Sequence, residues 1–153
     1  MPSLPVNGGP PTSPFFYKNP QYAICLDPNF IIDKQKAITA QTEVLVTYKS
    51  TDEASVRVFL CKAGEHSGRA TGVDETNIVN QKELKEAFRP IEGVANGIIT
   101  GAKPYTVVVS CFDRSMPIGG TLTLESDAPM LLKPLPEEGA GFIKQVFSGS
   151  FEF

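Results

Sequence analysis

The sequence predicts an all-β protein, an antiparallel β-sandwich of about eight strands of C2-like or jelly-roll type with at most one short helix. The length of 153 residues suits one domain. Apolar and polar residues alternate along several short runs, as they do in strands with one buried face. Turn-forming residues separate these runs. Only residues 80–88 have a helical composition, and this stretch is too short to be a main element.

The alternating runs predict the strands in order. The clearest has Thr42, Val44 and Val46 on one face, with Glu43 and Thr47 largely on the other. By the same pattern we expect strands at 21–26, 42–49, 55–60, 97–100, 105–112, 121–126, 130–132 and 141–147. Because only a short polar loop separates 42–49 from 55–60, these two runs are predicted to pair as an antiparallel hairpin.

The remaining segments are expected to be loops or an arm. Residues 1–14 hold five prolines and two adjacent glycines, so they are predicted to form an extended linker or docking arm. The glycine-rich stretch 64–76 is predicted to be a surface loop. The helical stretch 80–88 should stop before Pro90. We therefore divide the chain into an arm at 1–14 and a sandwich domain at 15–153.

Composition and charge limit the kinds of binding partner and cellular compartment that fit this sequence. The formal net charge is −3, and lysines and arginines are scattered singly, which argues against a nucleic-acid partner. The three cysteines stand inside apolar runs without Cys-x-x-Cys spacing, as small buried hydrophobes do in a reducing compartment. No stretch resembles a signal peptide or a membrane span. We expect a cytoplasmic protein.

A catalytic site would have to be assembled from few residues. His66 is the single histidine, so a Cys-His dyad would need it beside Cys111, with Asn77 or Asn80 as the orienting amide. However, Cys111 shares a strand face with Val109, which places its thiol in the core, where it is inert. We therefore predict that the domain is not an enzyme and has no catalytic residue.

The number and spacing of possible ligands also argue against a metal site. The cysteines are too far apart for a zinc site. Calcium prefers several converging carboxylates, and no loop holds a dense aspartate cluster. The acidic residues occur instead as pairs or singly, at Asp52-Glu53, Asp74-Glu75, Glu137-Glu138, Asp113 and Asp127. We expect these to be solvated loop charges and predict no cofactor-binding or metal-binding residue, with calcium as the open alternative.

Two segments resemble the C2-like sandwich domain, domain III, of calpain-type cysteine proteases. The first is Phe15–Tyr22, which contains Asn19-Pro20-Gln21-Tyr22 and follows Gly8-Gly9 by a few residues. The second is the valine-rich run Tyr105–Asp113 with Gly119–Ser126 after it. This pair is predicted to be a hairpin of two core strands, turned by a loop that contains Pro117 and Gly119-Gly120. The Pro134–Gly139 loop and Gly141–Phe153 tail are most similar to those of atypical calpains.

The resemblance implies a non-catalytic regulatory or docking domain that makes intramolecular or protein–protein contacts. A papain-like protease core is the candidate partner, in the same chain or beside it. The alternative from another class is a calcium-dependent sandwich that binds membrane phospholipid, and a third is an interaction sandwich with no link to a protease. The sequence does not indicate an oligomeric state.

Overall fold

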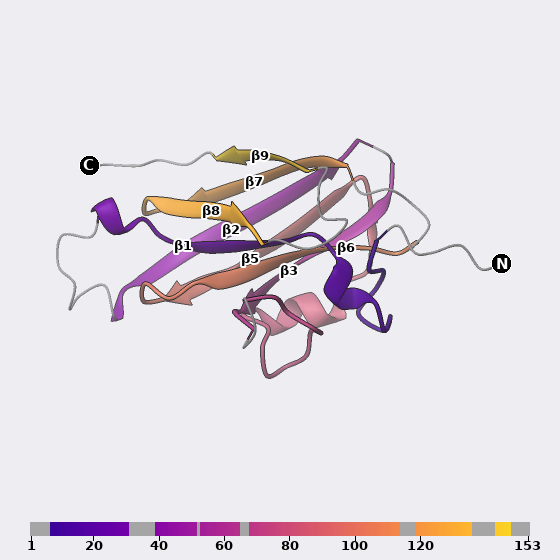
Figure 1. Ribbon diagram of the computed structural model, residues 1–153, viewed down its shortest axis with the longest axis horizontal. Helices are drawn as coiled ribbons and strands as arrows, with labels where there is room; N and C mark the ends of the chain where they lie inside the picture. The colour runs from indigo at the N-terminus through magenta and orange to yellow at the C-terminus, as the bar shows by residue number, and fades with distance from the viewer. Residues whose placement is uncertain are drawn as a thin grey trace.

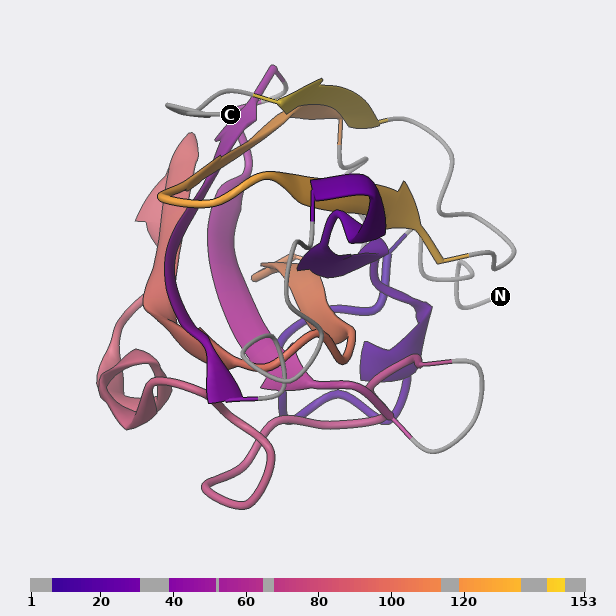
Figure 2. The same cartoon turned by 90° about the vertical axis from the view of Figure 1, so that its left-hand side faces the viewer.

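The chain folds into two packed β-sheets, shown as a ribbon in Figure 1 and along the strands in Figure 2. The computed structural model describes residues 7–30, 39–51, 53–64, 68–113 and 119–135, and the backbone of 143–147. In these residues, sheet A has the strand order β4-β3-β6-β1-β8 and sheet B the order β5-β2-β7-β9. The predicted all-β sandwich is confirmed.

Most strands lie close to the predicted runs, but β5 begins at Glu92, five residues before the predicted run 97–100, and β4 was not predicted. Every pair of neighbours is antiparallel in the described residues except β7 and β9, which are parallel. The strands are β1 (Gln21–Leu26), β2 (Gln41–Ser50), β3 (Ser55–Lys62), β4 (Arg89–Pro90), β5 (Glu92–Thr100), β6 (Tyr105–Cys111), β7 (Gly120–Ser126), β8 (Met130–Pro134) and β9 (Ile143–Phe147).

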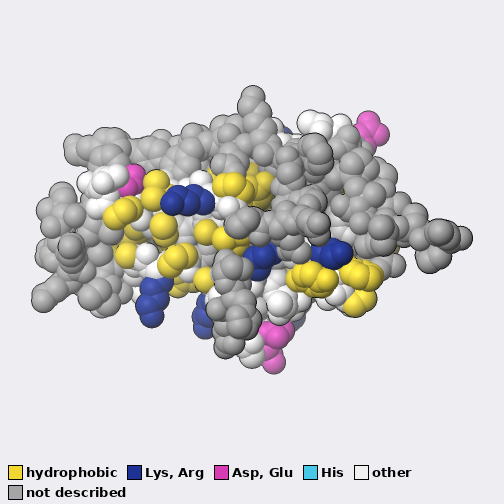
Figure 3. Space-filling model, viewed as in Figure 1, with side chains coloured by type: hydrophobic (Ala, Val, Ile, Leu, Met, Phe, Trp, Pro, Cys, Tyr) yellow, Lys and Arg dark blue, Asp and Glu magenta, His cyan; other side chains and the backbone are white. Residues whose placement is uncertain are grey.

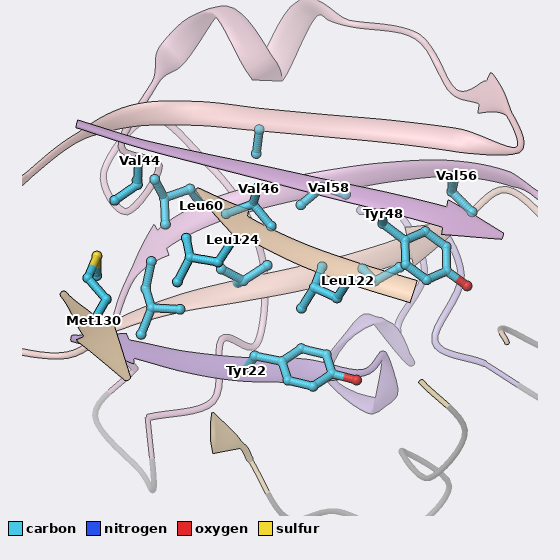
Figure 4. Packing of buried hydrophobic residues seen from close by; sticks show 14 of the residues in the cluster. Tyr22, Val44, Val46, Tyr48, Val56, Val58, Leu60, Leu122, Leu124 and Met130 are labelled. Atoms are coloured by element: carbon cyan, nitrogen blue, oxygen red, sulfur yellow. The ribbon is translucent and has the colours of Figure 1, made fainter. Parts of the chain in front are cut away.

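The main core fills the space between the two sheets. Alternate residues of each strand point inward, as the period of two predicts. Figure 4 shows these side chains meeting from both sheets, among them Tyr22 from β1, Tyr48 from β2 and Leu124 from β7. All three are almost completely buried. Burial of such side chains supplies most of the stabilisation of a domain of this size.

A second, smaller core lies on the outer face of sheet A. Phe59 and Cys61 of β3 and Val108 of β6 point away from the first core and are fully buried. Phe16 of the 3-10 helix η1 (Phe16–Lys18) covers them, with its ring edge-on to Phe59 at 6.1 Å between centroids. The loop after β3 adds Ile78. Sheet A is therefore buried on both faces over part of its area.

The predicted hairpin between β2 and β3 is wrong. The strands belong to different sheets: β2 pairs with β5 and β7, whereas β3 pairs with β4 and β6. Both strands point their even-numbered residues into the same core, but from opposite sides. An alternating pattern is the same for two neighbours in one sheet and for two strands that face each other, so it could not distinguish them.

The predicted hairpin between β6 and β7 is wrong for the same reason. β6 lies between β3 and β1 in sheet A, and β7 lies between β2 and β9 in sheet B. The chain crosses from one sheet to the other between Cys111 and Gly120. Pro117, which was expected in the turn, lies outside the described residues. The valine-rich strand thus packs across the core from β7 instead of bonding to it.

The helical elements that lie wholly within the described residues are short 3-10 turns, and Thr39 is the one described residue in an α-helical conformation. Residues 80–88 were expected to be the one helical stretch, and η3 (Gln81–Lys85) occupies the middle of it. Figure 1 shows this turn and the preceding loop together below the strands. The Asn80 side chain accepts a hydrogen bond from the Lys82 N–H and so caps the first turn. A second turn, η2 (Pro28–Phe30), follows β1.

Part of the predicted arm lies on sheet A. Asn7, Gly8 and Gly9 are buried, and the Gly9 carbonyl accepts hydrogen bonds from the Asn19 amide and the Ser110 hydroxyl, both at 2.8 Å. The Gly8 N–H donates to Asn19 Oδ1 at 2.9 Å. Residues 7–9 are therefore part of the packed structure. The division of the chain at residue 14 stays a prediction.

A buried amide fixes the loop that covers sheet A. The Gln21 side chain is 1% exposed, donates to the Ala70 carbonyl at 2.8 Å and accepts from the Ala70 N–H at 2.6 Å. Thr106 Oγ1 donates to the Gly68 carbonyl, and Arg69 donates to the carbonyls of Tyr17, Asn19 and Leu135. Segments far apart in the sequence thus hold the loop at 68–70 in place.

We predict that Gln21→Leu strongly destabilises the domain. The leucine leaves the Ala70 N–H and C=O without their partners inside the protein, which costs about 1–3 kcal/mol for each buried group. Urea denaturation should show a loss of about 2–4 kcal/mol in the free energy of unfolding. The matched control is Gln41→Leu at the exposed start of β2, which should change stability by less than about 0.5 kcal/mol. Equal losses in the two variants would contradict the prediction.

Candidate docking surface

The environment of the three cysteine thiols does not favour nucleophilic reactivity. Cys111 and Cys61 are fully buried, and Cys25 is half-buried. Burial is the largest cause that raises the pKa of each thiol, to about 12 for Cys61, where Glu83 and Asp74 add to the effect. A thiol with a raised pKa is a poor nucleophile at neutral pH. Cys111 points into the main core beside Val109, as the sequence predicted.

The two candidate orienting amides have structural partners. Asn77 Nδ2 donates to the Gly72 carbonyl at 2.7 Å, and its Oδ1 accepts from the Asp74 N–H. Asn80 Nδ2 donates to the Asn96 backbone and side-chain oxygens, both at 3.1 Å, while its Oδ1 caps η3. His66 lies outside the described residues. The absence of catalysis stays a prediction.

The acidic residues do not converge in the part of the chain that is described. There, no three His, Cys, Asp or Glu side chains are grouped as a metal site requires. The Asp74 carboxylate accepts hydrogen bonds from the Thr76 N–H and hydroxyl, so it shapes its own turn, and these bonds lower its pKa. Asp52 and Glu137-Glu138 lie outside the described residues. Neither calcium binding nor its absence is tested.

Two aromatic rings form an exposed surface at one end of β3. Phe112, directly after β6, is 65% exposed. Its ring packs edge-on against Phe88, with 5.5 Å between the centroids, and Phe88 is itself half-buried. The Phe112 N–H donates to the Ser55 carbonyl at 3.0 Å, which fixes this residue to the sheet. A large aromatic side chain held in the open by a rigid strand is typical of interaction sites.

An arginine supports these rings from the sheet. The Arg57 guanidinium, from the outer face of β3, lies 4.6 Å from the Phe59 ring centroid and 5.3 Å from that of Phe88. It also donates from Nη2 to the Glu83 backbone carbonyl at 2.5 Å. Burial is the main cause that lowers the pKa of Arg57. We call Arg57, Phe88 and Phe112 the aromatic surface, because the three side chains form one continuous stack.

A small pocket adjoins the aromatic surface. Its volume is about 200 Å³, and β3, β5 and the chain after η3 line it. Among the lining residues are Arg57, Glu83, Glu86, Arg89 and Asn96. The pocket therefore has polar and apolar lining residues in equal number, and it holds both signs of charge.

Glu83 is the unusual residue of this pocket. Its side chain is 3% exposed, and neither carboxylate oxygen has a hydrogen-bond partner. Burial, with a smaller contribution from Glu86, raises its pKa to about 8, and the neighbouring Leu60 backbone and Arg57 guanidinium offset only part of this rise. The carboxyl group is therefore mostly protonated at neutral pH, because an isolated buried carboxylate is strongly disfavoured.

Backbone strain occurs at the same end of β3. Ile91, between β4 and β5, has φ of +71°, which β-branched residues rarely adopt, and its side chain is 45% exposed. Hydrogen bonds hold it on both sides: its N–H donates to the Ala54 carbonyl, and its carbonyl accepts from the Ser50 N–H. Strain of this kind is common at functional sites, where the surrounding structure maintains it.

The outer surface of β1 and β8 differs in composition from the end of β3 that carries the aromatic surface. Figure 3 shows hydrophobic side chains over these strands, with lysine and arginine side chains standing among them. Lys133 of β8 lies close enough to Cys25 of β1 to counter, in part, the rise in the pKa of that thiol. No helix in the described residues is long and apolar enough to cross a membrane.

Sequence reasoning did not find the aromatic surface. Phe88 was assigned to a helix and Phe112 to the end of a core strand. A usable signal was the alternation in β6, because Phe112 is out of phase with the inward Val107, Val109 and Cys111. Glu83 carried no signal, since glutamate in a polar stretch is normally solvated.

Comparison with known proteins does not assign the chain to a family. No protein-family model matches it, and no curated protein matches it. The resemblance to the calpain sandwich domain therefore rests on the residues given above.

The pH dependence of stability provides a test of Glu83. Because its pKa rises from 4.5 in the unfolded chain to about 8 in the fold, the folded state keeps a proton that the unfolded state loses. Its contribution is fully present below pH 4.5 and is lost as the pH rises through 8. The free energy of unfolding should fall by about 1.4 kcal/mol per pH unit in this window, relative to Glu83→Gln.

The measurement is urea denaturation of both proteins at several pH values. The groups that face Glu83 are Arg57 and Cys61 of β3 and Glu86 of its own segment. Glu86→Gln is the control: it should keep most of the slope, because burial and not Glu86 is the main cause of the shift. Parallel profiles for the wild type and Glu83→Gln would show that Glu83 titrates normally.

The reactivity of the three thiols tests where the structure places the cysteines. We predict that Cys25 reacts first with a disulfide reagent, and that Cys61 and Cys111 react only when the protein unfolds, because both are fully buried. Mass spectrometry of the labelled peptides gives the order. Fast labelling of Cys111 in the folded protein would contradict its place in the core.

Proposed function

We propose that the domain is a non-catalytic docking or regulatory module of a calpain-like cysteine protease. The aromatic surface is the observation that carries this proposal. Arginine and aromatic residues are enriched at the centres of protein interfaces. Phe112 is exposed, its neighbours are held to the sheet, and little side-chain entropy remains to be lost on binding. The partner would be a papain-like protease core, in the same chain or beside it.

The geometry supports a docking role in a second way. The aromatic surface and the strained Ile91 lie at the same end of β3, beside Ser55 and Ala54 respectively. Arg57, Phe88, Ile91 and Phe112 are thus presented together at one end of sheet A. Preorganised groups of this kind bind at lower entropic cost than flexible loops do.

The test measures binding of the cysteine-protease segment of the parent gene, expressed separately, by titration calorimetry. Phe112→Ala should weaken binding by at least about tenfold, as expected for an interface anchor. Its melting temperature should hardly change, because the ring is mostly exposed. Ile98→Ala, on the other sheet and 55% exposed, is the matched control and should bind normally.

Two outcomes would overturn the proposed partner, and a third would overturn the role of the aromatic surface. One is a parent gene with no cysteine-protease segment and no such protein encoded beside it. The other is binding that needs both calcium and anionic vesicles and does not involve Phe112, which would favour the phospholipid alternative. Equal losses in Phe112→Ala and Ile98→Ala would also contradict a role for the aromatic surface.

A further inference from the structure

The outer face of sheet B carries a groove of about 540 Å³. Strand register places Asn96 of β5, Leu45 of β2 and Glu125 of β7 in one row across the sheet. Glu43 stands next to Ile98 in the adjacent row, and Asp127 follows the end of β7. The groove therefore runs over the sheet surface itself, and its walls are side chains of ordered strands.

The groove combines an apolar floor with acidic walls. Leu45 is half-buried at its floor, between Asn96 on one neighbouring strand and Glu125 on the other. Glu43, Glu125 and Asp127 are exposed, and no lysine or arginine lines the groove. None of the three carboxylates forms an ion pair within the described structure. An occupant must therefore bring positive charge together with an apolar group.

The edge of sheet B argues against an added strand. Gly101 N–H donates to the Ala40 carbonyl, so the odd-numbered residues of β5 bond to β2 and the even-numbered ones face outward. The Asn96 carbonyl accepts a hydrogen bond from Asn80 Nδ2, and the Thr100 N–H donates one to Tyr105 Oη, so part of this edge is already engaged. A strand added at the β5 edge would have to displace both of these bonds. We therefore place the occupant on the face of the sheet, where the groove lies.

We propose that this groove docks an extended, basic segment of a partner protein. Glu43 and Leu45 are two residues apart on one strand, about 6.5–7 Å along it. An extended segment presents alternate side chains at the same spacing, so a lysine over Glu43 places the next inward residue over Leu45. Acidic walls of this kind speed association and select basic partners. The proposal is independent of the proposed function, because the aromatic surface belongs to sheet A.

The experiment titrates the isotopically labelled full chain with a capped synthetic peptide in which lysine and valine alternate with serine. We expect saturable shifts at the backbone amides of Leu45, Asn96 and Ser126, and weaker binding at high salt. Replacing Glu43, Glu125 and Asp127 by Gln, Gln and Asn should weaken binding by at least about tenfold, which is 1.4 kcal/mol. Leu45→Thr should weaken binding less, and equally at low and high salt.

The matched control removes three negative charges elsewhere, by Gln at Glu53, Glu75 and Glu92, all exposed and outside the groove. It should bind the peptide as the wild type does. An equal loss in both triple variants would mean general attraction to an acidic protein and would overturn the proposal. So would the absence of saturable shifts in the wild type, or shifts confined to other residues. A peptide with glutamate in place of lysine should not bind.

Discussion

The paired hydrogen bonds between the Gln21 side chain and Ala70 are the interaction on which the covered face of sheet A depends. A sheet that is buried on both faces must satisfy the polar groups of the segment that covers it. The loop at 68–70 is not a strand and cannot use a ladder, so it takes its partners from side chains. Gln21 and Thr106, on neighbouring strands of sheet A, supply them. Without these bonds the second core would lose its cover.

The same requirement explains the residues that carry the resemblance to the calpain sandwich. Asn19 bonds to both Gly8 and Gly9, and Gln21 bonds to the loop after β3. Gly8 has to be glycine, because a Cβ there would lie 2.5 Å from the Phe15 carbonyl oxygen. Each of these residues has a structural reason to be present. The motif therefore marks a way of closing the sandwich, and the chemistry of binding has to be sought elsewhere on the surface.

Local pattern was enough for the strands and their faces, and it failed where distant segments decide the outcome. Val44 and Val56 were placed correctly inward, because the period of two is a local property. The pairing of their strands is not local: either pairing buries the same residues, and the crossing of the chain between sheets decides it. Glu83 is the same problem on a smaller scale. Glu83 is buried because the chain after β3 folds back onto that strand. A pattern of a few neighbouring residues does not predict such a contact between segments far apart in the sequence.

Glu83 and Arg57 are linked through a backbone hydrogen bond and through the raised pKa of the Glu83 carboxyl group. An ionised Glu83 carboxylate beside Arg57 would compete for its guanidinium, since charge-assisted pairs are stronger than contacts with rings. With the carboxyl group protonated, the guanidinium is left to bond to the Glu83 backbone carbonyl and to lie between Phe59 and Phe88. The Glu83 backbone carbonyl and the two rings thus hold Arg57 in the position that supports the aromatic surface. The pocket and the aromatic surface are for this reason one physical unit.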